Sequence, residues 1–281
     1  MNSILFVTVT VAAFAITALL GRWLIPELHK LKFGQTIREV GPKWHKNKQG
    51  TPTMGGLMFI LGIAVAMMAC LPVFYTLGVE ETFLMKVKVF AGLGMAVAFG
   101  AIGFMDDYIS ILKKRNLGLT EKQKLVLQFA VAAAYFMSLG LAGEPTATTI
   151  PFAGQLDLGW FYYPFTVFVV VGVVNSVNLT DGLDGLAGSV TLVDAAAFAL
   201  IFLAADASQL QKDSMIFAGI LAGAIMGFLR YNAYPARVMM GDVGSFLLGG
   251  ALSMLAIFSR LQLLIPFMGL MFMLSSISCI L

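Results

Sequence analysis

Long apolar segments most constrain what this chain can fold into. Nine of them have about the ~20 residues that a helix needs to cross a bilayer core of ~30 Å. Only 12% of the 281 residues are charged, against about 25% in soluble domains. The segments lack the strict alternation of membrane β-strands. We therefore predict an all-α, polytopic transmembrane bundle in one domain (1–281), with spans at about 3–25, 53–77, 86–104, 125–143, 161–177, 187–205, 214–230, 245–259 and 262–281.

The basic residues predict how these helices are oriented. The connections after the first and third segments hold most of the lysines and arginines. Cytoplasmic connections of membrane proteins carry an excess of these residues, so we predict that this side faces the cytoplasm and that the N-terminus lies outside. The outer connection at 144–160 contains Thr, Ile and Pro and is compatible with a short hairpin. The outer side holds only Lys86, Lys88, Lys212 and Arg260.

Charge and cysteine content exclude several other classes of protein. The formal net charge is +3, and no basic tract is interleaved with aromatic residues, so nucleic-acid binding is not expected. Cys70 and Cys279 lie in apolar segments and are expected to be buried free thiols rather than a disulfide or a metal site. No basic residue precedes the first segment, which we interpret as a membrane helix and not a signal peptide.

Five aspartates stand in three short polar stretches, each at the end of an apolar segment and on the predicted cytoplasmic side. A carboxylate near the bilayer core costs roughly 2.5–3.5 kcal/mol on insertion scales, so such residues are usually functional. The stretches read GFMDDY, NLTDGLDG and MMGDVGS. Small residues and oxygen ligands are typical of sites for magnesium and phosphate. The five are Asp106, Asp107, Asp181, Asp184 and Asp242.

The first stretch places Asp106 and Asp107 after Gly103, at the end of the third segment. Successive residues of a helix point about 100° apart, so one carboxylate is expected to hold a metal and the other to accept a proton. A solvated pair at a helix end is the alternative. The residues that follow predict a cationic strip for phosphates, although positive-inside charge explains some of them. The strip consists of Lys113, Lys114, Arg115, Asn116, Lys122 and Lys124.

The second stretch, NSVNLTDGLDGLAG, runs over residues 175–188. Asp181 and Asp184 are three residues apart and would share a face if they lay on a helix. The glycines would let the backbone approach a ligand, and Asn175 and Asn178 add amide donors and acceptors. An ordinary loop or a calcium site are the alternatives.

The third stretch, RYNAYPARVMMGDVGS, runs over residues 230–245. Pro235 is expected to break the helix, and Asp242 opens the next apolar segment. A carboxylate there could bind Mg²⁺ while backbone amides receive phosphate oxygens. Helix capping by Asp242 is the alternative.

Two further motifs stand out. GPKWHKNKQGTPTMGG, residues 41–56, combines lysines, His45 and threonine hydroxyls that could hold a diphosphate, but it is not a Walker loop. Gly219, Gly223 and Gly227 form a small-residue stripe at a spacing of four. Such a stripe predicts close helix packing, either within the chain, which we favour, or at a dimer interface.

Together and in this order, the four polar stretches resemble the phospho-N-acetylmuramoyl-pentapeptide transferase family (translocase I, MraY) of the polyprenyl-phosphate N-acetylhexosamine-1-phosphate transferase superfamily. GPKWHKNKQGTPTMGG is the most specific element, supported by NLTDGLDGLAG and NAYPARVMMGD. The resemblance implies a Mg²⁺-dependent enzyme of the bacterial cytoplasmic membrane, active on the cytoplasmic face as a homodimer. It would transfer phospho-N-acetylmuramoyl-pentapeptide from UDP-MurNAc-pentapeptide to undecaprenyl phosphate, giving lipid I and UMP.

The resemblance also implies roles for individual residues. Asp242 would be the magnesium ligand, and Asp106 the base that deprotonates the lipid phosphate, with Asp107 beside it. Lys48, Asn175, Asp181 and Asn232 match positions that bind the nucleotide. Further positions that line the substrate site match Thr53, Lys114, Lys122, Asn178 and Asp184.

The chain departs from the family pattern at several points. Ser110 stands where a lysine is expected, Met239 where an aromatic residue is expected and Val243 where a threonine is expected. The family continues with a histidine-rich loop and a tenth helix, which we expect this chain to lack, since its histidines are His29 and His45.

Two other functions are compatible with parts of the pattern. A transferase for GlcNAc-1-phosphate belongs to the same superfamily, but the GTPTMGG stretch argues against it. A transporter would place charges near the bilayer midplane. Here the aspartates gather at one face, and only Asp194 lies well inside a predicted span.

Overall fold

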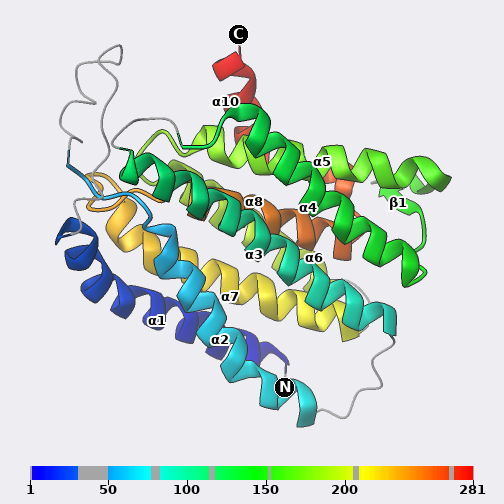
Figure 1. Ribbon diagram of the computed structural model, residues 1–281. Coiled ribbons are helices and arrows are strands. Elements are labelled where there is room, and N and C mark those ends of the chain that lie inside the picture. The colour runs from blue at the N-terminus through cyan, green and yellow to red at the C-terminus, as the bar shows by residue number, and fades with distance from the viewer. Residues whose placement is uncertain are drawn as a thin grey trace.

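The computed structural model describes residues 2–30, 50–76, 83–113, 118–150, 153–204, 209–265 and 269–280. Helices form most of this part of the chain (Figure 1). They are α1 (Asn2–Lys30), α2 (Gly56–Thr76), α3 (Phe83–Leu112), α4 (Glu121–Leu141), α5 (Tyr162–Thr180), α6 (Leu186–Ala204), α7 (Gln209–Asn232), α8 (Gly241–Phe258) and α10 (Leu270–Ile280). Two short strands, β1 (Ala147–Ile150) and β2 (Gly154–Asp157), and 3₁₀ turns at Gly159–Phe161 and Gln262–Leu264 complete them.

The predicted helical membrane bundle is confirmed. Seven described helices, α1 and α3 to α8, are long and apolar enough to cross a membrane, and Gly56–Ala69 of α2 is a shorter apolar stretch. The predicted last span, 262–281, divides into a 3₁₀ turn and the 11-residue helix α10. The count of nine spans and the outside N-terminus therefore stay predictions.

The core of the bundle is built around α7 and α8. Of the apolar windows in these two helices, 83% and 94% of the residues are buried inside the protein, far more than in any other described span. α8 packs mainly against α3 and α5, and α7 mainly against α1 and α6 (Figure 1). A central position for α8 means that its first residues are surrounded by the ends of other helices.

The glycine stripe on α7 serves packing within the chain. A Cβ on Gly219 would lie 2.6 Å from the Phe6 ring of α1, and one on Gly223 would overlap the carbonyl of Thr10. Because α1 covers the stripe, the alternative that we favoured from the sequence, close packing inside one chain, is the observed one.

The end of the bundle opposite the aspartates is closed by the predicted hairpin at 144–160. Its two strands pair antiparallel, with Ala147 opposite Asp157. The hydroxyl of Thr146 and the N–H of Gly159 both donate to Asp157 and hold the pKa of this exposed carboxyl below its usual range. Thr149 of β1 donates its N–H to the Arg260 carbonyl, beside the hairpin, at 2.8 Å.

A buried ion pair lies in the same region. Lys88 Nζ of α3 is 2.7 Å from Glu144 Oε1, and both side chains are almost completely shielded. Two buried charges are tolerated only when each is paired with the other, so this contact ties α3 to the segment that follows α4.

Candidate functional site

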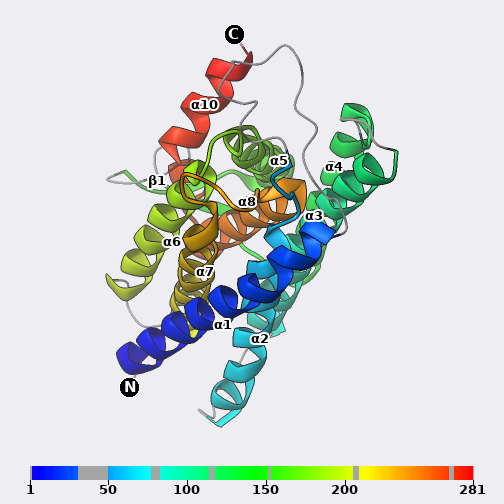
Figure 2. The same ribbon diagram turned by 90° about the vertical axis from the view of Figure 1, so that its left-hand side faces the viewer.

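The described parts of the predicted polar stretches meet at one end of the bundle, which faces the viewer in Figure 2. The C-terminal ends of α3, α5 and α7 and the N-terminal ends of α4, α6 and α8 lie there. Residues far apart in the sequence are therefore neighbours.

Three carboxylates form the centre of the site. Each of Asp106, Asp107 and Asp242 offers an oxygen atom, and the three atoms lie within 4.8 Å of one another. The first two lie inside α3, which continues to Leu112, eight residues beyond the predicted end of this span. Asp242 is in the first turn of α8. The two helices thus bring together carboxylates that are more than 130 positions apart in the sequence.

Lys124 bridges two of these carboxylates. Its Nζ lies 3.0 Å from Asp106 Oδ2 and 2.9 Å from Asp242 Oδ2. The start of α4 fixes this position, because Thr120 and Gln123 form a reciprocal capping box. One turn further along the chain, Lys124 then points toward the acidic cluster. From the sequence, this lysine is predicted only as one member of a cationic strip.

The remaining contacts orient the carboxylates. Asn178 Nδ2 of α5 donates to Asp242 Oδ1 at 2.8 Å and to Ser245 Oγ at 2.9 Å. Asp106 Oδ1 accepts the N–H of Leu119 at 2.6 Å, and Asp107 Oδ2 accepts the N–H of Val243 at 3.1 Å. Each carboxylate is therefore held by a group from another element.

Two glycines permit the close approach of α3 and α8. A Cβ on Gly103 would overlap the carbonyl group of Asp242, so only glycine lets the helices come this near. Gly241 has a φ of 76°, in the left-handed region that favours glycine. A Cβ there would lie 2.5 Å from Asp107 Oδ2 and 2.8 Å from Thr53 Oγ1.

The Thr53 hydroxyl and the Asp107 carboxylate thus both lie next to Gly241, at the start of α8, and Thr53 is only 8% exposed. Backbone hydrogen bonds join residues 52–56, which include Thr53, to residues 239–240, which precede α8. We call these two segments the backbone seam. Met239 N–H donates to the Pro52 carbonyl at 2.8 Å, and Gly55 and Gly56 N–H donate to the carbonyls of Met239 and Met240 at 2.9 Å. Lys48, His45 and the other lysines of this motif lie outside the described residues.

The donor set fits a hard divalent cation. Three carboxylates face one ammonium group, so the cluster keeps an excess of negative charge. Mg²⁺ is bound by one or two carboxylates with waters and phosphates completing its octahedron. Its one or two carboxylate ligands would come from Asp106, Asp107 and Asp242, since their oxygens are close enough to share an ion.

Comparison with known proteins agrees with this geometry. Residues 89–260 match the family model described as glycosyl transferase family 4, and residues 48–60 match phospho-N-acetylmuramoyl-pentapeptide-transferase signature 1. The chain is also similar to proteins named phospho-N-acetylmuramoyl-pentapeptide-transferase from three bacteria. They are those of Halalkalibacterium halodurans (42% identical over 96% of this chain and 80% of the relative), Bacillus subtilis (42%, 95% and 79%) and Bacillus thuringiensis (43%, 95% and 79%). The chain belongs to the phospho-N-acetylmuramoyl-pentapeptide transferase family.

The parts that match correspond to the site. The family model covers nearly all of α3 and all of α4 to α8, including the three carboxylates and Lys124. The transferase signature ends in α2 and contains Thr53 and residues 52–56 of the backbone seam. The chain is thus a transferase and an integral membrane protein.

The aspartates of the second stretch lie in a turn and not on a helix. α5 ends at Thr180, and residues 181–185 form a turn before α6, so Asp181 and Asp184 do not share a helix face. Gly185, at a φ of 73°, lets the chain reverse here. Asp184 Oδ2 accepts the N–H of Ala236 at 3.0 Å, which attaches the turn to the loop before α8.

Asn232 reinforces the same attachment. It is 1% exposed, accepts the N–H of Gly185 at 3.0 Å and donates to the Val238 carbonyl at 2.9 Å. The Asn232 side chain therefore joins the turn at 181–185 to the loop before α8. Its predicted contact with the nucleotide stays a prediction.

The remaining predicted site residues are Asn175, Lys122 and Lys114. Asn175 is one turn before Asn178 on α5 and donates to Gln128 Oε1 of α4 at 2.7 Å, a pairing that the sequence analysis missed. Lys122 is exposed on the first turn of α4. Lys114 lies outside the described residues.

Proposed function

We propose that this transferase moves phospho-N-acetylmuramoyl-pentapeptide from UDP-MurNAc-pentapeptide to undecaprenyl phosphate. An oxygen of the lipid phosphate forms a bond to the β-phosphorus of the nucleotide, and the bond between the α- and β-phosphates breaks. UMP leaves with the electron pair of that bond, and the new diphosphate-linked sugar lipid is lipid I. The family membership supports the class of reaction, and the substrates are our proposal.

The observation that carries the proposal is the cluster of Asp106, Asp107, Asp242 and Lys124. Two anionic substrates must be brought together, and a site for this reaction needs positive charge held next to groups that can take up a proton. The cluster meets both needs, since it combines oxygens that could hold an ion with an ammonium group that lies against two of the carboxylates.

Within the cluster we assign Asp242 as the magnesium ligand, in first-turn position on α8. Asp106 is the proposed base for the lipid phosphate, and Asp107 lies beside it and is held by the N–H of Val243. When bound, Mg²⁺ would neutralise the phosphate oxygens. Because Asp106 accepts hydrogen bonds from Lys124 and Leu119, it becomes a free base only when Lys124 turns to a phosphate.

The surrounding residues would bind the rest of the substrates. We propose that Asn178 and Thr53 orient groups next to Asp242, and that the exposed Lys122 attracts phosphate at the entrance. The nucleotide positions proposed are Lys48, Asn175, Asp181 and Asn232, with Asp184 and Lys114 nearby. We further propose one membrane domain in a bacterial cytoplasmic membrane, with the site on the cytoplasmic face and a homodimer as the assembly.

The proposal is tested by UMP release from the purified full chain with undecaprenyl phosphate and UDP-MurNAc-pentapeptide, in Mg²⁺ or in EDTA. We expect release only with Mg²⁺, and a fall of about 10²-fold or more in Asp242→Asn. The matched control is Asp157→Asn, an exposed aspartate on the outer hairpin, which should keep full activity. Release in EDTA would contradict the magnesium requirement, and no release from folded protein would contradict the reaction.

The choice of sugar needs its own comparison. UDP-GlcNAc supplied in place of UDP-MurNAc-pentapeptide should give no UMP, because the chain matches the muramoyl signature over residues 48–60. Equal turnover of both nucleotides would favour the GlcNAc-1-phosphate alternative.

A further inference from the structure

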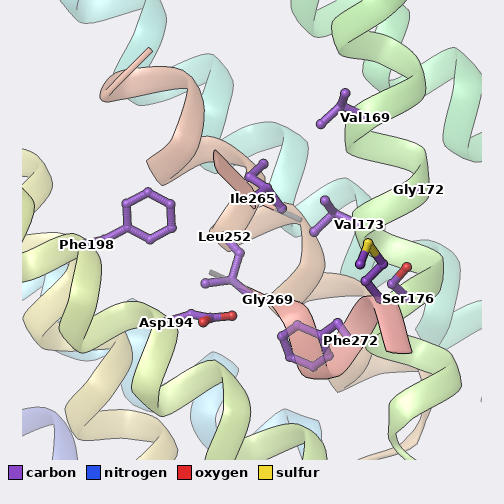
Figure 3. Close-up of a pocket in the computed structure, with 11 residues that line it drawn as sticks. Val169, Gly172, Val173, Ser176, Asp194, Phe198, Leu252, Ile265, Gly269 and Phe272 are labelled. Carbon is purple, nitrogen blue, oxygen red and sulfur yellow. The ribbon is translucent and has the colours of Figure 1, made fainter. Parts of the chain in front are cut away.

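A partly open cavity of about 230 Å³ lies between helices of the bundle, separate from the carboxylate cluster. It is lined by residues of α5, α6, α8 and α10 and of the segment before α10. Figure 3 shows the carboxylate of Asp194 pointing toward the middle of these residues, with the rings of Phe198 and Phe272 near it. Nearly all of the lining is apolar.

Asp194 is unusual among the acidic residues of this structure. It is the ninth residue of the 19-residue helix α6 and is only 4% exposed. In the part of the chain that the structure describes, no hydrogen bond or ion pair reaches its carboxylate. A buried carboxylate without a partner is costly, so it either carries a proton or awaits a cation.

Contacts within the described part of the chain do little to explain why the Asp194 carboxylate is buried. Oδ2 of Asp194 lies 3.5 Å from where a Cβ of Gly269 would be, at the start of α10, and the N-terminus of a helix attracts negative charge. Yet no N–H of the described part of α10 donates to this carboxylate. The transferase reaction does not use Asp194 either, since α6 contributes no residue to the acidic cluster.

The chemistry of the lining selects the kind of cation. A metal ion prefers several oxygen ligands, and Asp194 and Ser176 are the only side chains with oxygen among the described residues that line the cavity. An organic ammonium group needs fewer polar partners. It can pair with one carboxylate and stack on aromatic rings, while its apolar body fills the rest of the cavity.

We propose that this cavity is a binding site for a small hydrophobic amine, whose ammonium group pairs with Asp194 and whose apolar part packs between Phe198 and Phe272. The volume is sufficient, because a dry protein cavity of roughly 150 Å³ accommodates benzene. An arylalkylamine a few carbon atoms larger therefore matches the space of about 230 Å³.

The test measures binding of 4-phenylbutylamine and of its neutral analogue 4-phenylbutan-1-ol by calorimetry, to the full chain in nanodiscs, with empty nanodiscs subtracted. The amine should bind the wild type, and more tightly than the alcohol. Asp194→Asn should weaken the amine by about tenfold or more, the size of one charge-assisted hydrogen bond, and leave the alcohol unchanged. Asp157→Asn, on the exposed outer hairpin, is the control for loss of a carboxylate.

A second pair of variants tests the location. Gly172 is exposed at the edge of the cavity and a Cβ there meets nothing within 4 Å, so Gly172→Leu adds a bulky side chain at this edge without a clash in α5. Gly94 on α3 is equally open and does not line it, so Gly94→Leu is the matched control. Gly172→Leu should abolish binding of both compounds, and Gly94→Leu should abolish neither.

Several results would overturn the proposal. Equal affinity for amine and alcohol would show that Asp194 is protonated or that it serves only the start of α10. Binding that survives Gly172→Leu would show partition into lipid. If Asp194→Asn does not fold, the comparison of amine with alcohol on the wild type and on Gly172→Leu still decides the question.

Discussion

At the scale of single residues, Lys124 gives the site its character. It is the ammonium group that lies against both Asp106 and Asp242, from two different helices. Without it, three carboxylates would lie together with no positive side chain in contact among the described residues. The lysine therefore supports both the fold of this end and the proposed approach of phosphates.

The first prediction concerns this residue. Lys124→Met keeps the aliphatic stem but removes the charge, and should lower kcat for UMP release by about 10²–10³-fold. Mg²⁺ should bind at least as tightly as before, because the carboxylates keep their charge. Lys122→Met, two residues away and exposed, should mainly raise KM. Equal effects of the two variants on kcat would contradict the central role of Lys124.

A second prediction at this scale concerns Asn232. Asn232→Ala removes two hydrogen bonds and leaves the Gly185 N–H and the Val238 carbonyl unpaired in a buried place. The free energy of unfolding should fall by about 2–4 kcal/mol. Thermal unfolding followed by circular dichroism measures this, with Asn178→Ala as the comparison. If Asn232→Ala lowers only nucleotide affinity at unchanged stability, its main role is in binding.

At the scale of helices, the site depends on how closely α3 and α8 approach. Gly103→Ala should force them apart, because its Cβ would overlap the Asp242 carbonyl. We expect a loss of about 1–3 kcal/mol in stability together with loss of UMP release. Gly94→Ala, on the same helix with open space around it, should instead gain up to about 1 kcal/mol. Full activity in Gly103→Ala would mean that this approach is not needed.

The buried ion pair at the other end is a second element-scale contact. Lys88→Met leaves Glu144 charged and buried without its partner, and should cost about 3–5 kcal/mol. The double variant Lys88→Met with Glu144→Gln should recover much of this loss. The measurement is the thermal midpoint of the wild type, of Lys88→Met and of the double variant. A double variant no more stable than Lys88→Met would contradict the pairing.

Helix ends mark the limit of what could be predicted from the sequence. The apolar pattern correctly indicated a helical membrane bundle, but it stopped near residue 104, whereas α3 runs to Leu112. Backbone hydrogen bonding continues into polar residues, which hydropathy cannot detect. The turn at 181–185 lies in the predicted connection between the spans 161–177 and 187–205, but spacing alone could not show whether Asp181 and Asp184 continue a helix or leave it.

Contacts between elements were harder still to predict. Lys124 was one of several basic residues in a strip, and composition did not distinguish it from Lys122. The Thr120–Gln123 capping box is a readable signal that would have given the start of α4, and hence the shared face of Lys124 and Gln128. The pairing of Gln128 with Asn175 depends on the placement of two helices, which local patterns do not contain.

At the scale of the whole molecule, α1 is held against the core through the glycines of α7. Gly223→Ala would overlap the Thr10 carbonyl and should detach α1, lowering the thermal midpoint without changing the oligomeric mass. Light scattering coupled to chromatography measures the mass, and Gly94→Ala is the control. A fall in mass at unchanged stability would indicate that the stripe contributes to an interface between copies.

The backbone seam has a consequence for sequence change. Met239 and Val243 replace residue types expected from the resemblance, yet the contacts observed at both positions are made by main-chain atoms. Met239 is only 2% exposed, and its N–H and carbonyl join the two segments of the seam. Both residues are buried, so a new side chain at either position must fit the same space, but one that fits leaves these main-chain contacts and the position of Asp242 unchanged.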